Sequence, residues 1–347
     1  MTAPFPAVLD YPLAAPPEPG RSIEVAPGIL WLRMPLPFAL DHINLWLLAE
    51  SEGWTLVDTG YGNAQTRAIW EEHFATTLGG KPVTKIVATH CHPDHVGNAA
   101  WLSARFGCPV TMTHGEFLAA HAIIDERAAH GPADTCAMFR RHGMSEADVA
   151  ALAARGNHYR RGVPEAPRWF RRMLAGDTVR AGGDDWTVIV GHGHSSEHAS
   201  LFSAAHDILI SGDMLLPKIS TNVSVWPSDP DGDPLGRFLS SIGDYETLPP
   251  SSLVLPSHGL PFRGIALRVA QLRAHHAARL AELHEAIAAS GEPATAAQMI
   301  PVLFRRALDL QQSFFAMGET IAHLNHLWRQ GRLTRLRAAD GALSFHA

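Results

Sequence analysis

The sequence predicts an α/β fold, on three observations. Short apolar segments typical of strands occur in both halves of the 347-residue chain, and helix-like segments lie between them. With 46% hydrophobic and 18% charged residues, the chain can build a sizeable core, which excludes global disorder. An Ala- and Arg-rich stretch at about 115–176 separates the strand-rich parts, so we expect a helical insertion there.

The first strand-rich part begins near Ser22. Residues 43–49 and 54–57 predict two strands of a hairpin that turns at 51–53. Downstream, the pattern predicts a helix, a buried strand, a second helix and a short strand at 65–78, 85–89, 96–106 and 109–113. After the insertion, strand patterns return at 186–190, 199–204, 207–211 and 252–256.

Three regions follow from these patterns. We expect an extended Pro-rich arm at 1–21, a main α/β domain at 22–264 and a mainly helical C-terminal extension at 265–347. Within the extension, helices are predicted at 278–290, 295–304 and 314–330, with Thr295 as an N-cap. A terminal hairpin is predicted around Asp340-Gly341. Three helices followed by a small hairpin make a winged-helix arrangement.

Charge and cysteine content narrow the class of protein. A net charge of −6 and a pI of about 6.4 exclude a wholly basic nucleic-acid binder. They do not exclude a local basic patch that binds nucleic acid. Three cysteines are too few for a disulfide scaffold and favour a reducing compartment. No apolar run approaches the ~18–20 residues of a membrane span, and the N-terminus does not resemble a secretory signal. We therefore expect a cytoplasmic protein with no membrane partner.

Histidine is the residue type in excess, with 21 in the chain. The segment THCHPDH at 89–95 offers several potential metal ligands directly after a predicted buried strand. Pro93 suits the first turn of a following helix, so side chains on this strand-to-helix turn can diverge toward two neighbouring metal ions. Three more candidates also follow predicted strands: His194, Asp213 and His258. This placement predicts a metal site at the ends of the strands.

Five motifs occur in order: VDTG (57–60), THCHPDH (89–95), GHGHSSEH (191–198), SGD (211–213) and PSHG (256–259). As an ordered set they resemble the metallo-β-lactamase superfamily, close to its glyoxalase II-like hydrolases. The resemblance implies a four-layer αβ/βα sandwich with the site at one rim of its two sheets. One departure is visible, because His192 stands where the family's third motif usually has a proline.

The resemblance implies a dinuclear centre. Carried over by position, it assigns the first metal to His90, His92 and His194, and the second to Asp94, His95 and His258. Asp213 would bridge the two metals together with a hydroxide that serves as the nucleophile, so Asp94 and Asp213 are the expected catalytic carboxylates. Asp58 would support the site without binding metal. Two zinc ions are the default for such a site, and iron or manganese also suit mixed His/carboxylate ligands.

Three further residues close to these motifs lie off the matched ligand positions. His192 and His198 are expected to support the site or to pack in the core. Cys91 lies inside the second motif, where we expect a small packed side chain and no ligand.

Two arginine-rich segments bear on the substrate. Between residues 155 and 172, six arginines stand against one glutamate, which fits either a solvated helix face or a clamp for an anionic substrate handle. Coenzyme A, glutathione and phosphate are such handles, because arginine binds carboxylate and phosphate through a two-pronged fork. The proposed clamp consists of Arg160, Arg161, Arg171 and Arg172. In the extension, the run Arg329, Arg332, Arg335 and Arg337 leaves nucleic-acid contact open, and a helical cap that packs or forms a homodimer is favoured.

Together these features predict a dinuclear metal-dependent hydrolase of a small-molecule thioester or ester. The alternatives are a single-stranded RNA endonuclease or phosphodiesterase, and lactonase or β-lactamase activity at the same site. A non-enzymatic metal-bound sensor is disfavoured because every matched ligand is present. The chain has no Gly-x-Ser-x-Gly elbow, so a serine hydrolase is unsupported.

Overall fold

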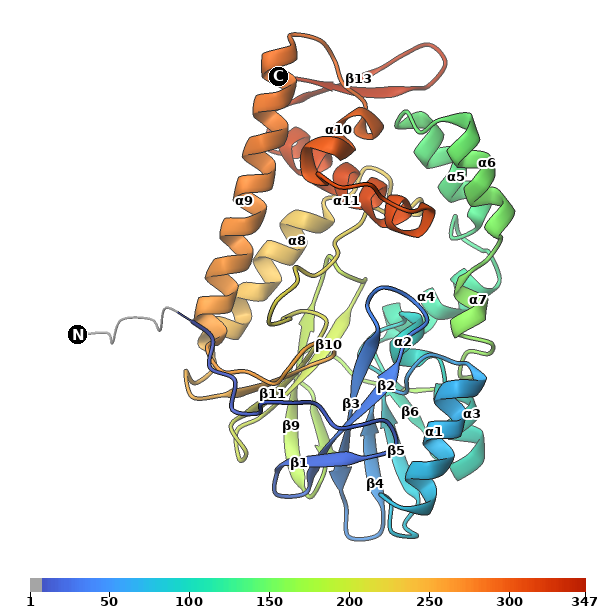
Figure 1. Cartoon of the computed structure of the whole chain (residues 1–347), viewed down its shortest axis with the longest axis vertical. Helices are drawn as coiled ribbons and strands as arrows, with labels where there is room; N and C mark the ends of the chain where they lie inside the picture. Colours follow the sequence, from blue (N-terminus) through green and yellow to red (C-terminus); the bar gives the residue numbers. More distant parts are fainter. Residues whose placement is uncertain (1–7) are drawn as a thin grey trace, which may run out of the picture.

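The computed structural model describes residues 8–347, which form an αβ/βα sandwich (Figure 1). Seven strands of this part of the chain make one sheet in the order β1-β2-β3-β4-β5-β6-β7. Five others make the facing sheet in the order β12-β11-β10-β9-β8. Helices cover the outer face of each sheet, so the predicted α/β class and its four layers are confirmed.

The first sheet starts as an antiparallel meander and continues with parallel strands. Its meander consists of β1 (Ser22–Ala26), β2 (Ile29–Pro35), β3 (His42–Ala49) and β4 (Trp54–Val57). The parallel part adds β5 (Val83–Val87), β6 (Val110–Met112) and the two-residue edge strand β7 (Arg171–Arg172). The predicted hairpin at 43–49 and 54–57 is confirmed as β3 and β4. Helix α1 (Ala64–Ala75) connects β4 to β5.

The second sheet carries the strands predicted in the second half of the chain. It consists of β8 (Thr178–Ala181), β9 (Asp184–Gly191), β10 (His198–Ser203), β11 (Ile208–Gly212) and β12 (Leu253–Pro256). The last four lie within two residues of the predicted bounds. Strands β11 and β12 are parallel, and α8 (Pro234–Ser241) with the 3-10 helix η1 (Ile242–Thr247) connects them.

The single helix predicted at 96–106 is wrong in one respect, because two helices, α2 (Pro93–Val96) and α3 (Ala99–Phe106), occupy this region. The break falls at Gly97 and Asn98. The Asn98 side-chain amide donates to the carbonyl oxygens of residues 59–61 at 3.0–3.2 Å. A Cβ at position 97 would collide with the backbone of Gly162. Close packing at this turn therefore interrupts the helix.

Along the chain, four helices follow β6 and precede β7 of the first sheet. They are α4 (His114–Ile124), α5 (Pro132–Arg141), α6 (Glu146–Arg155) and α7 (Tyr159–Gly162). Helix α7 packs on α2, which carries part of the histidine motif, and α6 packs on a helix of the C-terminal region. These helices therefore border the rim of the sandwich where the histidines emerge.

The C-terminal region contains three helices and a hairpin: α9 (Ile265–Ser290), α10 (Ala296–Leu303), α11 (Leu310–Arg329), β13 (Thr334–Arg337) and β14 (Leu343–His346). The helix predicted at 278–290 covers only the second half of α9, which begins directly after Gly264. Thr295 is the predicted N-cap of α10 and accepts a hydrogen bond from the backbone of Gln298. The hairpin predicted around Asp340-Gly341 is confirmed, with β13 and β14 antiparallel.

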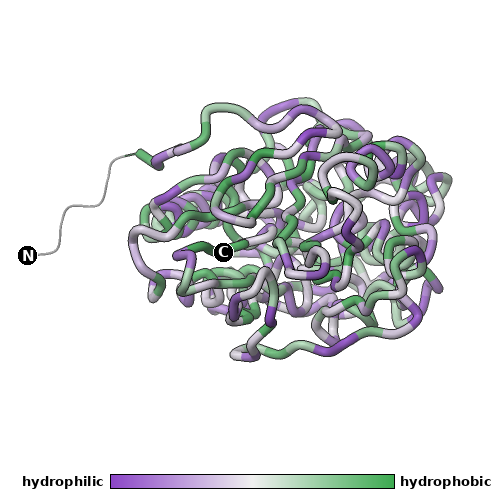
Figure 2. Tube along the Cα trace, turned by 90° about the horizontal axis from the view of Figure 1, so that it is seen from below, coloured by the Kyte–Doolittle hydropathy of each residue, from purple (hydrophilic) through white to green (hydrophobic). Residues whose placement is uncertain are grey.

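The packed interior has two large parts and a small third one around Cys91, Ala120 and Ile123. Apolar and polar stretches alternate along the coloured trace of Figure 2. One large part fills the space between the sheets and extends under α1 and α3. The other large part lies on the outer face of the second sheet, where Leu209 and Val254 pack with Phe238, Val269 and Leu324 of α8, α9 and α11. The C-terminal helices therefore share this second core with the second sheet.

Of the predicted arm, residues 1–7 lie outside the described part of the chain. Leu9 is buried in the second core, and Asp10 pairs with Arg263 through backbone hydrogen bonds of 2.8 and 3.3 Å. Leu9 and Asp10 therefore lie beside the start of α9, whereas Gly20, at the other end of the segment, lies against Glu72 of α1. Among residues 8–347, no helix is long and apolar enough to cross a membrane. The three cysteines are buried and form no disulfide.

His142 at the end of α5 makes the stability of the fold depend on pH. It is buried and stacks on Phe345 of β14, with ring centroids 6.2 Å apart. Burial, reinforced by Arg141 and Arg335, lowers the pKa of His142 to about 4. An unfolded histidine titrates near pH 6.5, so the stability that this neutral ring contributes is present above that pH and is lost as the pH falls toward 4.

We predict that His142→Phe, which keeps an aromatic ring against Phe345, removes this dependence. Between pH 7 and pH 5, the free energy of unfolding should fall by about 2 kcal/mol less in the variant than in the wild type. Urea denaturation at both pH values measures the difference, and the pH 7 value of the variant reports whether the ring packs. Equal losses in the two proteins would show that His142 is not the titrating group.

Candidate metal centre

The VDTG motif at the end of β4 positions the THCHPDH motif that follows β5. Asp58 has a φ of 61°, and this turn brings its carboxylate under the strand-to-helix turn after β5. The carboxylate accepts hydrogen bonds from the backbone N–H of Thr89 at 2.8 Å and from Nδ1 of His95 at 2.8 Å. Asp58 therefore orients the ring of His95 and leaves its Nε2 facing the rim.

Two other histidines are oriented in the same way by backbone carbonyls. Nδ1 of His194 lies 2.7 Å from the carbonyl oxygen of Asn222, and Nδ1 of His258 lies 2.7 Å from that of His42. A carbonyl can only accept, so each Nδ1 carries a proton and Nε2 is the ring nitrogen left to bind a metal. The Nε2 atoms of both rings point toward Asp213.

The structure brings the seven predicted ligands together in two groups. In the first, the ligand atoms of His90, His92, His194 and Asp213 lie within 4.8 Å of one another. In the second, those of Asp94, His95 and His258 meet the same limit. Nε2 of His90 is 2.9 Å from Nδ1 of His92 and 3.2 Å from Nε2 of His194. Each group offers enough donors for one cation.

Asp213 lies between the groups, at the end of β11. Its Oδ2 is 3.3 Å from Nε2 of His194, which belongs to the first group. Its Oδ1 is 3.5 Å from Nε2 of His95 and 3.4 Å from Nε2 of His258, which belong to the second. One carboxylate oxygen thus faces each group, which is the arrangement that a shared ligand requires.

Burial and neighbouring charges set the protonation of these groups. Burial, reinforced by the adjacent imidazoles, lowers the pKa of His90 and of His92 well below the usual value. Burial disfavours the ionised form of Asp213, but His258 and His95, protonated when no metal is bound, outweigh it and hold the pKa of this carboxyl well below its usual range. The carboxylates in turn outweigh burial and raise the pKa of His95 and of His258, so a metal must displace a proton from each of these two rings. Neutral imidazole and ionised carboxylate are the forms that bind a cation.

Two buried atoms test whether a metal fits this donor set. Nε2 of His95 and Oδ1 of Asp213 are buried and have no hydrogen-bond partner among the described residues. Such atoms are costly to bury unless something binds them. Both atoms belong to the predicted ligand set and face the same centre. Imidazole nitrogen and carboxylate oxygen are donors that bind divalent cations, so a metal fits this site.

Three residues that hold the ligand loops were not predicted. Glu116 of α4 is buried and accepts hydrogen bonds from the backbone N–H groups of Cys91 at 2.8 Å and Glu197 at 2.7 Å. The Tyr159 hydroxyl of α7 donates to the carbonyl oxygen of Cys91. On the opposite side, the Asn44 side-chain amide donates to the carbonyl oxygens of residues 256 and 259 at 2.8 and 2.9 Å. Only Asn44 had a visible signal, since it interrupts an apolar strand.

The extra histidines and Cys91 lie beside the centre. His198 is buried, and its Nε2 accepts a hydrogen bond of 3.0 Å from the backbone N–H of Asp213. Gly212 approaches that ring so closely that a Cβ there would collide with it. His192 directs Nδ1 to the carbonyl oxygen of Ser196, 2.7 Å away. Cys91 is buried, and its sulfur belongs to neither ligand group.

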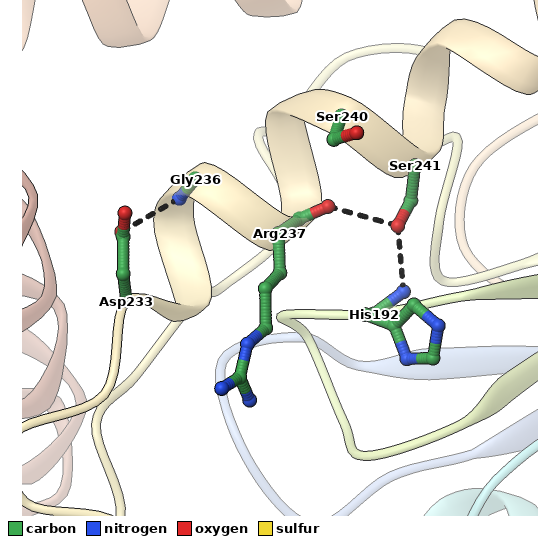
Figure 3. Close-up of a pocket in the computed structure, with 6 residues that line it drawn as sticks. All are labelled: His192, Asp233, Gly236, Arg237, Ser240 and Ser241. Carbon is green, nitrogen blue, oxygen red and sulfur yellow. Dashed lines mark hydrogen bonds between the residues drawn. The ribbon is translucent and has the colours of Figure 1, made fainter.

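A pocket of about 460 Å³ lies next to the loop that carries His194 (Figure 3). Its walls come from α8 and from the loop after β9: His192, Asp233, Gly236, Arg237, Ser240 and Ser241. The Ser241 hydroxyl accepts from the backbone N–H of His192 at 3.0 Å and donates to the carbonyl oxygen of Arg237 at 2.8 Å. This pocket contains none of the seven predicted ligands.

The four arginines of the predicted clamp fall in two places. Arg160 and Arg161 lie on α7, which packs on α2, and the charges of Arg161 and Asp94 both act on Tyr61. Arg171 and Arg172 form the edge strand β7, where Arg171 is close enough to Lys85 to affect its pKa. All four are exposed. The α7 pair therefore lies on a helix that contacts α2, the helix of Asp94 and His95.

Comparison with known proteins agrees with this architecture. A family model described as the metallo-beta-lactamase superfamily matches residues 39–258, and one for a metallo-beta-lactamase-like C-terminal domain matches residues 280–347. The chain therefore belongs to the metallo-beta-lactamase superfamily. A beta-lactamase domain protein from Burkholderia ambifaria superimposes with a TM-score of 0.90 at 46% identity, covering 97% of this chain and 98% of that one.

More distant relatives extend the comparison. A metallo-beta-lactamase family protein from Thermus thermophilus has a TM-score of 0.78 at 28% identity and covers 93% of this chain and 99% of its own. The probable metallo-hydrolase YqjP of Bacillus subtilis is 23% identical over 313 residues, which cover 88% of this chain and 94% of that protein. The chain is thus a member of a metallo-hydrolase superfamily, with His and Asp clusters for a dinuclear metal site.

The position of Asp213 predicts that metal content depends on this single carboxylate. Asp213→Ala should bind fewer than two metals per chain, and its turnover should fall at least about 100-fold. Elemental analysis of the purified protein measures the metal content. Asp244→Ala, at an exposed acid on η1, is the matched control and should keep the wild-type content. A variant at position 213 that retains two tightly bound metals would contradict the bridging role.

Proposed function

We propose that this protein is a dinuclear metal-dependent hydrolase of a small-molecule thioester or ester. The observation that carries the proposal is the placement of Asp213 between two groups of imidazole and carboxylate donors. His90, His92 and His194 would hold one metal, Asp94, His95 and His258 the other, and Asp213 both. Zinc is the expected metal, and iron or manganese suit the same donors.

The chain's own residues prepare this centre for hydrolysis. Asp58 and the carbonyl oxygens of Asn222 and His42 fix the rings of His95, His194 and His258 through Nδ1, so that their Nε2 atoms converge. Two cations bound there would supply an activated water and polarise the carbonyl oxygen of an acyl substrate. No serine or cysteine nucleophile is needed, and the buried Cys91 thiol, whose pKa burial raises well above the usual value, is a poor candidate for one.

Two similarities support a thioester substrate. A segment of 52 residues, 15% of this chain and 20% of the relative, is 48% identical to a hydroxyacylglutathione hydrolase of a Bradyrhizobium species. Over 195 residues, 54% of this chain and 63% of the relative, the chain is 25% identical to the acyl-coenzyme A thioesterase MBLAC2 of Gallus gallus. Glutathione and coenzyme A are both anionic handles, which Arg160 and Arg161 beside α2 could bind.

The RNA alternative depends on the basic run of the extension, and the structure uses part of this run internally. Arg329 donates to the carbonyl oxygen of Asp231 at 2.7 Å, and Arg335 donates to its carboxylate at 2.7 Å. The Arg335 guanidinium also lies over the ring of Trp328, 3.7 Å from its centroid. Two of the four arginines are thus engaged in packing the extension, which favours a small-molecule substrate.

Substrate screening tests the proposal directly. Protein loaded in turn with zinc, iron or manganese should hydrolyse an acyl-coenzyme A or an acyl-glutathione, and a chelator or Asp213→Ala should abolish the activity. Thiol release measured with a chromogenic disulfide gives the rate. Lactones, a β-lactam and single-stranded RNA complete the panel. Metal-dependent cleavage of RNA without thioester turnover would overturn the proposal in favour of the nuclease.

The arginines of α7 predict an effect on substrate affinity. Replacing Arg160 and Arg161 with Gln should raise KM for the anionic thioester about 5-fold with little change in kcat, because these contacts are equal in the ground and transition states. The effect should shrink at high salt. Gln at Arg171 and Arg172 on β7 is the matched control with the same loss of charge. Equal effects of the two pairs at low salt would indicate general charge attraction and no handle site.

A further inference from the structure

The C-terminal helix α11 reaches the loop that orients a predicted metal ligand. The loop after Asp213 passes under α11, where the backbone N–H of Val225 donates to the carbonyl oxygen of Gly318 at 3.2 Å. A Cβ at Gly318 would lie 2.8 Å from the Ser224 hydroxyl, so glycine allows the close approach. In Figure 1, α11 crosses above the rim of the sandwich, between α8 on one side and α5 and α6 on the other.

Within this contact, Asn222 connects α11 to the metal centre. Its side-chain amide donates to Oε2 of Glu319 at 3.0 Å, and its side-chain oxygen accepts from the Ser224 hydroxyl at 2.8 Å. Its main-chain carbonyl oxygen is the acceptor for Nδ1 of His194 at 2.7 Å. The side chain and the carbonyl belong to one residue, so fixing the first restricts the second.

We propose that Glu319 is a positioning residue for the metal centre, holding Asn222 so that its carbonyl oxygen orients His194. The inference rests on the proposed metal site. It makes the C-terminal region part of the site's construction although that region supplies no ligand. Outer partners of a metal-binding imidazole fix its ring orientation, and their loss commonly costs 10- to 100-fold in metal affinity or activity.

The chemistry of Glu319 supports a specific role. Burial raises the pKa of this carboxyl to about 7, partly offset by the hydrogen bond from Asn222. Glu319 is half-buried, and a carboxyl partly withdrawn from water is unfavourable unless a polar group binds it, as the Asn222 amide does. Met317 and Ile321, two positions away on either side, are buried and lie on the opposite side of the helix.

A double-mutant cycle on metal affinity separates positioning from general packing. The full-length protein is prepared as wild type, Glu319→Leu, Asn222→Ala and the double variant. Cobalt affinity is measured by competition with a chelator, and the cobalt absorption spectrum reports the ligand geometry. Each single variant should bind cobalt at least about 10-fold more weakly and show a changed spectrum. The double variant should bind no more weakly than the more affected single variant, because both changes break the same connection.

Two controls keep the outcome clear. Glu319→Gln retains an oxygen that can accept from Asn222, so it should recover most of the affinity and the wild-type spectrum. Thr320→Val removes a buried hydroxyl of α11 that bonds only within the helix, to the carbonyl oxygen of Ala316, and it should leave cobalt binding unchanged. Additive losses in the cycle, or wild-type affinity in both single variants, would overturn the role of Glu319. Failure of the wild type to bind two metals would instead refute the proposed metal site.

Discussion

A buried carboxylate facing three imidazoles is the constraint on which the rest of the site depends. Asp213 lies where the loops after β5, β11 and β12 and the loop after β9 meet, and its two oxygens face His194, His95 and His258. Removing one such charge from water is unfavourable unless opposite charge and hydrogen bonds compensate it. Each of these rings must therefore be held in place, which explains why each has its own acceptor behind it.

The acceptors come from different layers of the molecule, and the sandwich brings them together. Asp58, which orients His95, follows β4 of the first sheet. The carbonyl oxygen that orients His258 belongs to His42, the first residue of β3, and the one that orients His194 belongs to Asn222 in the loop beneath α11. Glu116 adds a connection from α4 that joins the second and third motifs. The two sheets supply the ligands at one rim, while the helices of the insertion and the extension hold the loops that carry them.

The candidate ligands stand out in the sequence because they occur in short motifs directly after predicted strands, and the resemblance to the metallo-β-lactamase superfamily divides them between two metals. Their supports could not, because the acceptors of His194 and His258 are backbone carbonyls, which any residue provides. Glu116 and Tyr159 lie in the stretch that the sequence predicts only as a helical insertion. Asn44 was visible as a lone amide in an apolar strand, but only the fold shows that it faces residues 256–259. The interruption at Gly97 was hidden for the same reason, since its cause is tertiary packing.

The C-terminal extension contains no predicted metal ligand, but this does not make the metal site independent of it. The sequence predicts no metal ligand after His258, so the extension can affect the site only through packing and hydrogen bonds. In the structure, Leu324 of α11 is buried in the same core as Leu209 and Val254 of the second sheet. Strand β11, which contains Leu209, ends where Asp213 begins. Loosening of α11 would therefore disturb both the packing behind Asp213 and the contact that Glu319 makes with Asn222. If Glu319 acts as proposed, the stability of the extension and the affinity for metal would thus be coupled through two routes, one apolar and one polar.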